Sequence, residues 1–387
     1  MEFQHSTIET YLQQWLGRPV TLEALQQLGT ESTGAAALKA FGYGQPLLID
    51  YRVGDEQNPD EQNCDEQNPD AQNRIASEHD KLHRVVLRRV KRSGFGHERD
   101  ADCMAEIWLS FNTFNHMQHH VAALDLAGVT ADNRLTSLGA LQELLLVTAY
   151  APGQPYAEDL LRIRNGGVCT AQDLRRAQVL ATHLADLHRV KHDDPLLWRR
   201  RLRDLVGDGE GIMGLTDSYP ADFPLATPAD LQKIETAANE WRWRLKPLAH
   251  RLSQVHGDFH PFNILFAEGE DFHLLDRSRG EWGEPADDVS CLAINYLFFS
   301  LQRYGELAGP FADLYTAFWE AYLAHQRDAE LFSVIQPWFV WRILVLASPQ
   351  WYPKLEMTAR RKLFNFARRI VAEERFEWQQ INSYLAD

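Results

Sequence analysis

The sequence predicts an α+β fold of two lobes, in which a small antiparallel sheet precedes a larger, mainly helical part. The segments LLIDYRV (47–53) and HRVVLRRVK (83–91) are rich in apolar and β-branched residues, and we read them as antiparallel strands. After a break rich in Pro and Gly at 151–155 the apolar spacing becomes helical, as in residues 173–188. Strands followed by helices are typical of α+β proteins.

The length and the composition fit this division. A chain of 387 residues is long for one compact domain, and 45% of its residues are hydrophobic, which is ample core material. We therefore expect an N-terminal lobe over residues 1–150 and a helical C-terminal lobe over residues 151–387.

The first lobe is expected to open with a helix. Ser6 followed by Glu9 is a capping-box pattern with apolar residues at helical spacing behind it, and Gly17 ends the helix. A second helix is predicted over 22–28. Next comes a hairpin, in which a strand at 37–41 is joined to LLIDYRV by the turn GYGQP.

Three later segments complete the expected architecture. Apolar residues recur at helical spacing over 100–114, and residues 135–147 predict two further strands. The last third of the chain, 292–387, reads as helical and rich in aromatic residues, which at such spacings mostly build core.

Residues 55–73 repeat a five-residue acidic unit, DEQNPDEQNCDEQNPDAQN. This stretch contributes −7 to the net charge of −15 and leaves −8 for the other 368 residues. Its side chains cannot bury apolar area, so we expect a disordered loop within the sheet connection. The mildly acidic remainder argues against partners that select basic patches, and we expect neither nucleic acid nor a membrane surface as a partner.

The sequence also carries an expectation about the compartment. The first residues show no basic flank followed by an apolar run, so no signal peptide is expected, and the apolar stretches are too short or too interrupted to span a bilayer. The four cysteines are scattered and form no close pair. These features predict a reduced, cytoplasmic protein.

The segment QVHGDFHPFNILF (254–266), followed by HLLDRSRGEWGEPADDVS (273–290), carries the groups that phosphoryl transfer needs. One Asp must accept or orient a substrate hydroxyl, and an amide oxygen five residues later can reach a metal ion. A second carboxylate at the end of a neighbouring strand must bind metal that bridges the phosphates. Asp258, Asn263 and Asp276 stand at these positions.

This segment resembles the catalytic loop of the aminoglycoside phosphotransferase and choline-kinase-like family, whose members are relatives of protein kinases. The resemblance implies a protein-kinase-like fold with ATP and Mg²⁺ as cofactors. It implies Asp258 as the catalytic residue, with Asn263 and Asp276 as magnesium ligands. It also implies that Asp288 bonds the backbone of the catalytic loop and that His256 braces the loop.

The N-terminal lobe matches the family less closely. The family's third strand carries a Lys that pairs with the nucleotide phosphates and with a Glu on the following helix. Arg88 stands in that frame here, while Lys91 lies on the opposite face by strand alternation. Glu106 is the best partner for Arg88, and Glu98 is the second. The alternative that Arg88 is a solvated strand residue stays open.

The remaining nucleotide contacts are also implied by the resemblance. Gly42 and Gly44 lie in a turn that would cover the phosphates, although an ordinary hairpin turn explains them equally well. Thr148 and Tyr150 lie where the family's strand joins the linker between the lobes, and their backbone groups would face adenine.

Two charged groups are ambiguous. The basic run at 199–203 reads as a solvated helix face rather than a phosphate-binding patch. The carboxylates of Glu281, Glu284 and Asp287 either face an amine of the substrate or belong to a solvated loop.

The leading hypothesis is ATP-dependent transfer of the γ-phosphoryl group to a hydroxyl of a small molecule. The alternative is a pseudokinase, a nucleotide-binding regulatory or interaction protein without turnover, because the third-strand Lys is missing and the acidic repeat interrupts the sheet lobe. Protein phosphorylation is less favoured, since no peptide-binding activation segment is recognisable.

The repeat yields a direct prediction. Excising residues 55–73 should leave the melting temperature and any catalytic activity nearly unchanged, because the closure entropy of a flexible loop varies slowly with its length. Thermal unfolding and turnover of the shortened chain check this expectation. Loss of soluble protein on excision would instead show that the repeat is structural.

Overall fold

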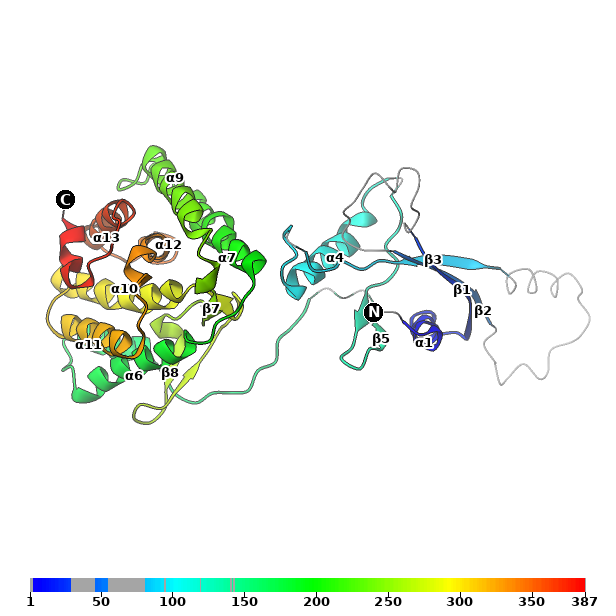
Figure 1. Cartoon of the computed structure of the whole chain (residues 1–387), viewed down its shortest axis with the longest axis horizontal. Coiled ribbons are helices and arrows are strands. Elements are labelled where there is room, and N and C mark those ends of the chain that lie inside the picture. The colour runs from blue at the N-terminus through cyan, green and yellow to red at the C-terminus, as the bar shows by residue number, and fades with distance from the viewer. Residues whose placement is uncertain are drawn as a thin grey trace, which may run out of the picture. The chain divides into compact units, whose positions relative to one another are not determined.

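The protein folds into two compact units, Met1–Thr148 and Ala149–Asp387, in the computed structural model (Figure 1). The structure describes residues 3–28, 46–54, 81–93, 95–118, 120–139, 141 and 143–386. The strand predicted at 37–41, the glycine turn with Gly42 and Gly44, and the acidic repeat at 55–73 lie outside the described residues.

The first unit is built on a three-stranded antiparallel sheet with the order β1-β2-β3. Its elements are α1 (His5–Leu16), β1 (Val20–Gln27), β2 (Leu47–Val53), β3 (His83–Leu87), α4 (Asp100–Phe114), β4 (Ala127–Val129) and β5 (Leu135–Ser137). Ile8 and Leu12 of α1 are buried with Ile49 and Tyr51 of β2, so the first helix covers one face of the sheet. The predicted strand 47–53 and helix 100–114 are confirmed.

The helix predicted over 22–28 is wrong. The residues of this segment favour helix, but they form β1, which pairs along its length with β2 and contains a bulge between Leu22 and Ala24. Pairing of strands outweighs the weak local preference of the residues. The capping box is also wrong, because α1 starts at His5 and the Glu9 carboxylate accepts the Leu22 backbone N–H at 2.9 Å. Gly17 ends α1 as predicted, with a positive φ of 67°.

Two other strand predictions need correction. The strand predicted over 83–91 ends at Leu87. Of the two strands predicted over 135–147, the described residues form only β5, which pairs with β4. Leu144 and Val147 are 74% and 92% exposed in a segment without regular structure. An apolar run becomes a strand only where a neighbouring strand is available to pair with it.

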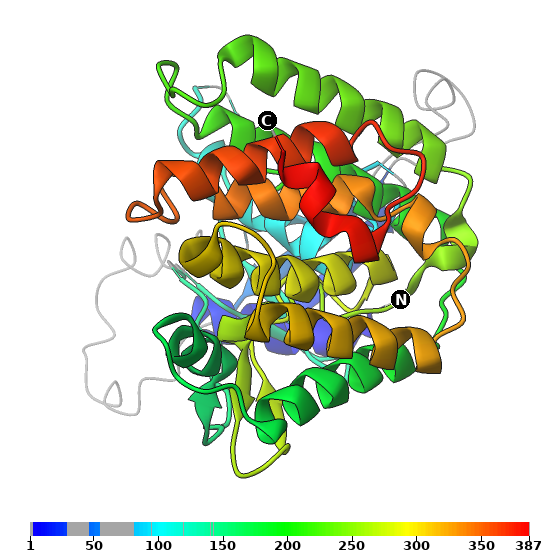
Figure 2. The same ribbon diagram turned by 90° about the vertical axis from the view of Figure 1, so that its left-hand side faces the viewer.

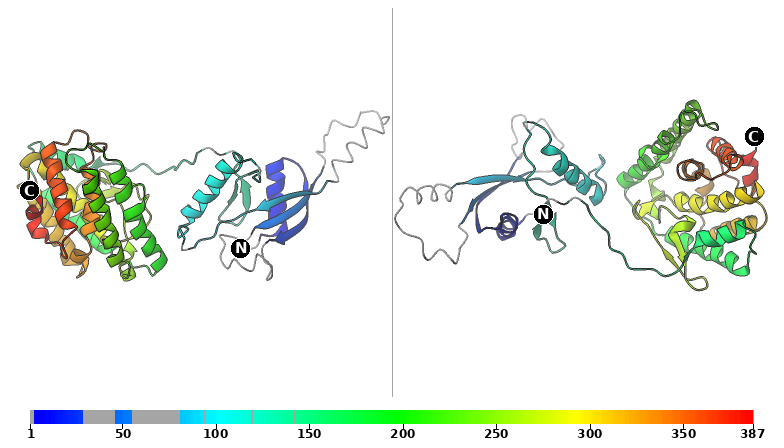
Figure 3. Two further views of the ribbon diagram at one scale, coloured as in Figure 1. Left: turned by 90° about the horizontal axis from the view of Figure 1, so that it is seen from above. Right: turned by 180° about the vertical axis from the view of Figure 1, so that it is seen from behind.

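The second unit is predominantly helical (Figures 2 and 3). Its helices are α5 (Tyr156–Arg164), α6 (Ala171–Leu187), α7 (Pro195–Gly207), α8 (Ile212–Asp217), α9 (Pro228–Leu245), α10 (Pro285–Tyr304), α11 (Pro310–His325), α12 (Gln336–Leu346) and α13 (Met357–Ile370). Its short strands are β6 (Gln154–Pro155), β7 (Ser253–Gln254), β8 (Ile264–Phe266), β9 (Phe272–Leu274) and β10 (Trp282–Gly283). The predicted α+β class, with a sheet part followed by a helical part, is confirmed.

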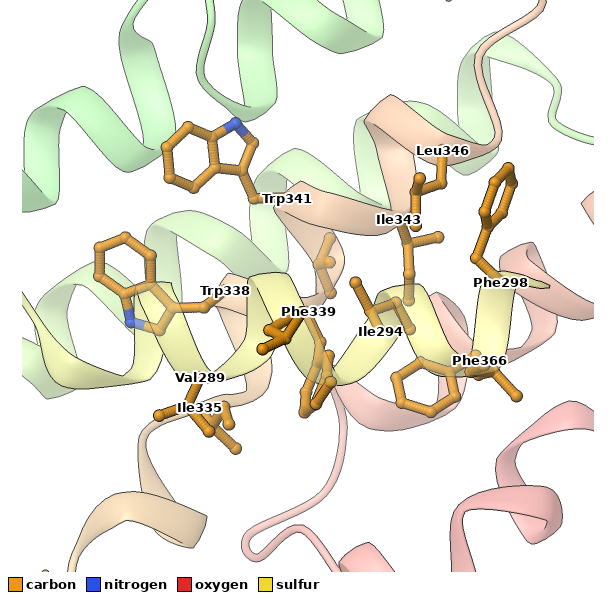
Figure 4. Close-up of a cluster of buried hydrophobic side chains, with 14 of the residues drawn as sticks. Val289, Ile294, Phe298, Ile335, Trp338, Phe339, Trp341, Ile343, Leu346 and Phe366 are labelled. Atoms are coloured by element: carbon orange, nitrogen blue, oxygen red, sulfur yellow. The ribbon is translucent and has the colours of Figure 1, made fainter. Parts of the chain in front are cut away.

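Helix α10 is the centre of this unit. It packs against α11 and α12, and α12 packs in turn against α13. Figure 4 shows Ile294 of α10, Phe339 of α12 and Phe366 of α13 in the shared apolar core, where all three are fully buried. No helix in the described part of the chain is long and apolar enough to cross a bilayer.

Two pairs of strands position the catalytic-loop motif of the second unit. Strands β7 and β10 pair antiparallel, as do β8 and β9. The residues from β7 to β8 therefore form a loop next to the segment from β9 to β10. The start of α10 follows β10 directly, which brings its first turn to the same loop.

The burial of α10 yields a stability prediction. Leu297 is 0% exposed, so Leu297→Ala should reduce the free energy of unfolding by about 2–5 kcal/mol through lost apolar contact and the cavity left behind. Leu196→Ala, at a position 47% exposed on α7, should change it by less than about 0.5 kcal/mol. Urea unfolding followed by tryptophan fluorescence measures both. Equal losses in the two variants would contradict the placement of α10 in the core.

Candidate active site

The motif around Asp258 forms a tight loop whose backbone depends on a glycine. Gly257 has a positive φ of 87°, a conformation that residues with a side chain rarely adopt. The glycine of the HGD sequence is therefore required by backbone geometry.

Asp288, in the first turn of α10, fixes this loop through hydrogen bonds with its backbone. Its two carboxylate oxygens accept the backbone N–H groups of His256 and Gly257, each at 2.7 Å. His188 follows the end of α6, and its Nε2 lies 3.2 Å from the same carboxylate. Nδ1 of His188 lies 2.8 Å from the Tyr322 hydroxyl. All these groups are buried. The hydrogen bonds predicted for Asp288 are thus present.

The ionised form of Asp288 is favoured despite its position. Burial raises the pKa of a carboxyl, but the hydrogen bond and charge of His188 and the backbone N–H of His256 outweigh it and hold the pKa of Asp288 below its usual range. An anion at this place also suits the N-terminal end of α10.

His256 joins the loop to the strand beside it. Its Nε2 donates to the Leu275 carbonyl at 2.9 Å, and its Nδ1 accepts the Asp258 backbone N–H at 3.3 Å. Burial lowers the pKa of His256, so the neutral ring that this pattern requires is favoured. Both ring nitrogens are engaged by backbone groups, which is the arrangement of a bracing residue.

The Asp258 carboxylate is surrounded by cationic groups. Its Oδ1 lies 2.6 Å from Nη1 of Arg279 and 2.7 Å from Nη1 of Arg342, and its Oδ2 lies 3.5 Å from Nε2 of His260. Burial raises the pKa of Asp258, but the His260 hydrogen bond and the charges of Arg342 and Arg279 outweigh it and hold that pKa well below its usual range. The side chain keeps 15% of its surface exposed, so a substrate group can still reach it.

Asn263 and Asp276 lie at the same end of the β8-β9 hairpin. Asn263 precedes β8, Asp276 follows β9, and the Leu275 N–H donates to the Asn263 carbonyl at 2.9 Å. Nδ2 of Asn263 donates to the Asp258 carbonyl at 3.1 Å, which leaves the amide oxygen for another partner. Asp276 is exposed and has a positive φ of 52°.

These two residues form no metal site by themselves. Among the described residues, no group of three or more His, Cys, Asp and Glu side chains is placed to hold a metal ion. An amide oxygen and one exposed carboxylate suit Mg²⁺, which keeps waters and takes phosphate oxygens as further ligands. The donor set therefore fits a metal that arrives with a nucleotide.

The predicted pair of Arg88 and Glu106 does not form in the first unit. Arg88 lies just beyond β3, is exposed, and stands over the Phe114 ring at 5.8 Å. Glu106 of α4 bonds instead to Nε2 of His97. Thr148 and Tyr150 are exposed in the segment where the first unit ends and the second begins.

Two expectations about charged side chains are wrong for some of their residues, although Arg199 and Glu281 are exposed as a solvated face and a solvated loop require. Arg201, read as part of a solvated helix face, is 3% exposed and donates to the Arg279 carbonyl at 2.9 Å. Glu284 and Asp287 do not face an amine or solvent. Both are fully buried, Glu284 against Arg251 and Asp287 against Arg342. The spacing of apolar residues predicts a helix, but it does not show which charged side chains of that helix are buried beside a carboxylate from another element.

The two arginines that touch Asp258 are functional candidates that the sequence motif did not indicate. Arg279 follows Asp276 by three residues, and Arg342 lies 84 residues beyond Asp258 on α12. The sequence held one signal for Arg342, because a lone charge within the apolar run FVWRILVL needs a buried partner.

The sequence matches the phosphotransferase enzyme family (APH) over residues 70–332, which is more than half of the chain. The protein belongs to this family, and the resemblance seen in the catalytic loop is confirmed. No match was found among curated proteins.

Three solved structures with partial similarity to this chain are proteins named as kinases or as a member of a kinase family. An amicoumacin kinase in complex with AMP-PNP, Ca²⁺ and amicoumacin is 14% identical over 94% of this chain and 91% of that chain, with a TM-score of 0.38. A choline/ethanolamine kinase family protein from Mesorhizobium loti is 14% identical over 67% and 78%, with a TM-score of 0.36. A glucosamine kinase is 18% identical over 59% and 56%, with a TM-score of 0.32. The match thus spans just over half the length of the glucosamine kinase.

The role of Asp288 yields a prediction for stability. Asp288→Ala should cost about 1–3 kcal/mol for each of the two buried N–H groups that lose their acceptor. Asp276→Asn should change the free energy of unfolding by less than about 0.5 kcal/mol, because the residue is exposed and Asn tolerates a positive φ. Urea unfolding of the two variants gives the comparison. A loss for Asp288→Ala no larger than that for Asp276→Asn would contradict the holding role.

Proposed function

We propose that this member of the phosphotransferase family uses ATP and Mg²⁺ to transfer the γ-phosphoryl group to a hydroxyl of a small molecule. One observation carries the proposal. The catalytic loop is held by Asp288 so that Asp258 keeps an accessible carboxylate, while Asn263 and Asp276 stand at the adjoining end of the β8-β9 hairpin. This is the set of groups that phosphoryl transfer requires.

The chemistry assigned to the chain is mainly positioning. The acceptor hydroxyl donates a hydrogen bond to Asp258, which fixes its oxygen in line with the γ-phosphorus. The new bond joins that oxygen to phosphorus while the bond to the bridging oxygen breaks and ADP leaves. The hydroxyl proton passes to Asp258 and then to solvent. The low pKa of Asp258 favours the ionised form that must accept this hydrogen bond.

The amide oxygen of Asn263 and the carboxylate of Asp276 would hold the metal. When bound, Mg²⁺ neutralises charge on the phosphates during transfer. Asn263 is suited to this because its Nδ2 is tied to the Asp258 carbonyl, which couples the metal ligand to the catalytic loop.

The nucleotide contacts assigned to the first unit are part of the proposal. Arg88 is exposed, and among the described residues its guanidinium lies over the Phe114 ring, which leaves its donors for the phosphates. Thr148 and Tyr150 remain the proposed backbone partners of adenine. Gly42 and Gly44 remain the proposed cover of the phosphates.

The second candidate function is nucleotide binding without turnover. The separation of Arg88 from Glu106 favours it, because an active kinase of this type holds a cation on the third strand by a helix carboxylate. The intact set of Asp258, Asn263 and Asp276 favours catalysis.

The test of catalysis is Mg²⁺-dependent ATP consumption with an acceptor panel of glucosamine, choline, ethanolamine and amicoumacin, extended to a metabolite library. Asp258→Ala should lower turnover by about 10²- to 10⁴-fold while ATP binding persists, since this Asp serves the acceptor. Asp222→Ala, at an exposed position on the loop before α9, is the control and should leave turnover unchanged. Turnover within a few-fold of wild type in Asp258→Ala would reject the assignment.

The metal site is tested by a separate measurement. Ligand binding to the folded state raises its melting temperature by mass action, and Asp276→Asn should abolish the part of the ATP-induced shift that depends on Mg²⁺. Asp271→Asn, an exposed position in the turn of the same hairpin, should keep that shift. An undiminished shift in Asp276→Asn would place the metal elsewhere.

A further inference from the structure

Arg342 is a charged residue in an apolar helix. Its neighbours on α12 from Gln336 to Leu344 are all buried, and its own side chain is 6% exposed. Burying a guanidinium without partners would cost several kcal/mol, so its position requires compensating groups. Those groups come from two other elements, the catalytic loop and the first turn of α10.

The guanidinium connects these elements through its two terminal nitrogens. Nη1 lies 2.7 Å from Oδ1 of Asp258, and Nη2 donates to the Gly257 carbonyl at 3.0 Å and to Oδ1 of Asp287. The planar group also stacks over the Trp341 ring, with 4.2 Å to the centroid. Asp287 adjoins Asp288 on α10, so the fork ties the Asp258 side chain to the helix that holds the loop backbone.

Arg279 reaches the same carboxylate oxygen from the exposed side. Its Nη1 lies 2.6 Å from Oδ1 of Asp258, and it donates to the Gly257 carbonyl at 3.1 Å. Oδ1 therefore carries two charge-assisted contacts. Among the described residues, Oδ2 is approached only by Nε2 of His260 at 3.5 Å, which is a longer and weaker contact than either contact of Oδ1. Oδ2 is the oxygen of Asp258 that remains for another donor.

We propose that Arg342 is a positioning residue for phosphoryl transfer, which occupies Oδ1 of Asp258 and so presents Oδ2 to the acceptor hydroxyl. The inference rests on the proposed function. In this role Arg342 acts through its contact with Asp258. The planar fork is needed because one residue must reach the two carboxylates of Asp258 and Asp287 at once, which the single ammonium of Lys does less well.

The first experiment compares Arg342→Gln and Arg342→Lys with Arg251→Lys. Arg251 is a matched control, because its side chain is 4% exposed and pairs with the carboxylates of Glu284 and Asp328 rather than with Asp258. The acceptor is the member of the panel above that wild type phosphorylates fastest. Folded Arg342→Gln should lose about 10- to 100-fold in kcat with KM for ATP within about threefold, as expected when a reacting group is misplaced. Arg342→Lys should lie between it and wild type, and folded Arg251→Lys should keep kcat within threefold.

The outcomes separate the two proposals. A kcat for Arg342→Gln within threefold of wild type, or a loss in Arg251→Lys as large as in Arg342→Gln, overturns the positioning role while catalysis stands. If wild type consumes no ATP with any acceptor, the proposed function fails. The coupling between Arg342 and Asp258 is then tested by the free energy of unfolding. The urea midpoints of Asp258→Asn, Arg342→Gln and the double variant should then shift non-additively if the two side chains are coupled, whereas additive shifts overturn the pairing.

Discussion

The catalytic loop depends on the contact between one buried carboxylate and two backbone N–H groups. Asp288 accepts from His256 and Gly257, and the left-handed backbone at Gly257 would otherwise leave both donors buried without partners. The carboxylate is itself fixed at the start of α10, a helix in which 17 of 20 residues are buried. The position of Asp258 therefore depends on the packing of the helical core around α10.

Buried charge in the second unit is organised in pairs around this point. Arg251 neutralises Glu284 immediately before α10, and Arg342 neutralises Asp287 within its first turn. Such pairs add little net stability, because desolvation offsets most of the attraction, but removing one partner is expensive. Of the two arginines, Arg342 also contacts Gly257 and Asp258, so its pair joins α12 and α10 to the catalytic loop.

In the first unit, local sequence patterns predict some elements of secondary structure correctly and others wrongly. The pattern of 47–53 and of 100–114 predicted the right elements, because their apolar residues have the period of the structure they form. Residues 20–27 carry a helix-favouring composition and still form a strand, because β2 provides a full ladder of partners. Arg88 and Glu106 stand at the positions of a paired cation and carboxylate, but in the fold Arg88 lies over the Phe114 ring and Glu106 bonds to His97.

The sequence by itself determined the α+β order through its periodicity and the catalytic motif through its residues, and the family resemblance implied the contact of Asp288 with the loop. Only the tertiary structure decided the surroundings of Asp258. Arg342 is 84 residues away in the chain, and Arg201, Glu284 and Asp287 looked like surface charges until packing buried them. A side chain's partner across the core depends on how helices pack, and the spacing of residues along one segment does not contain that information.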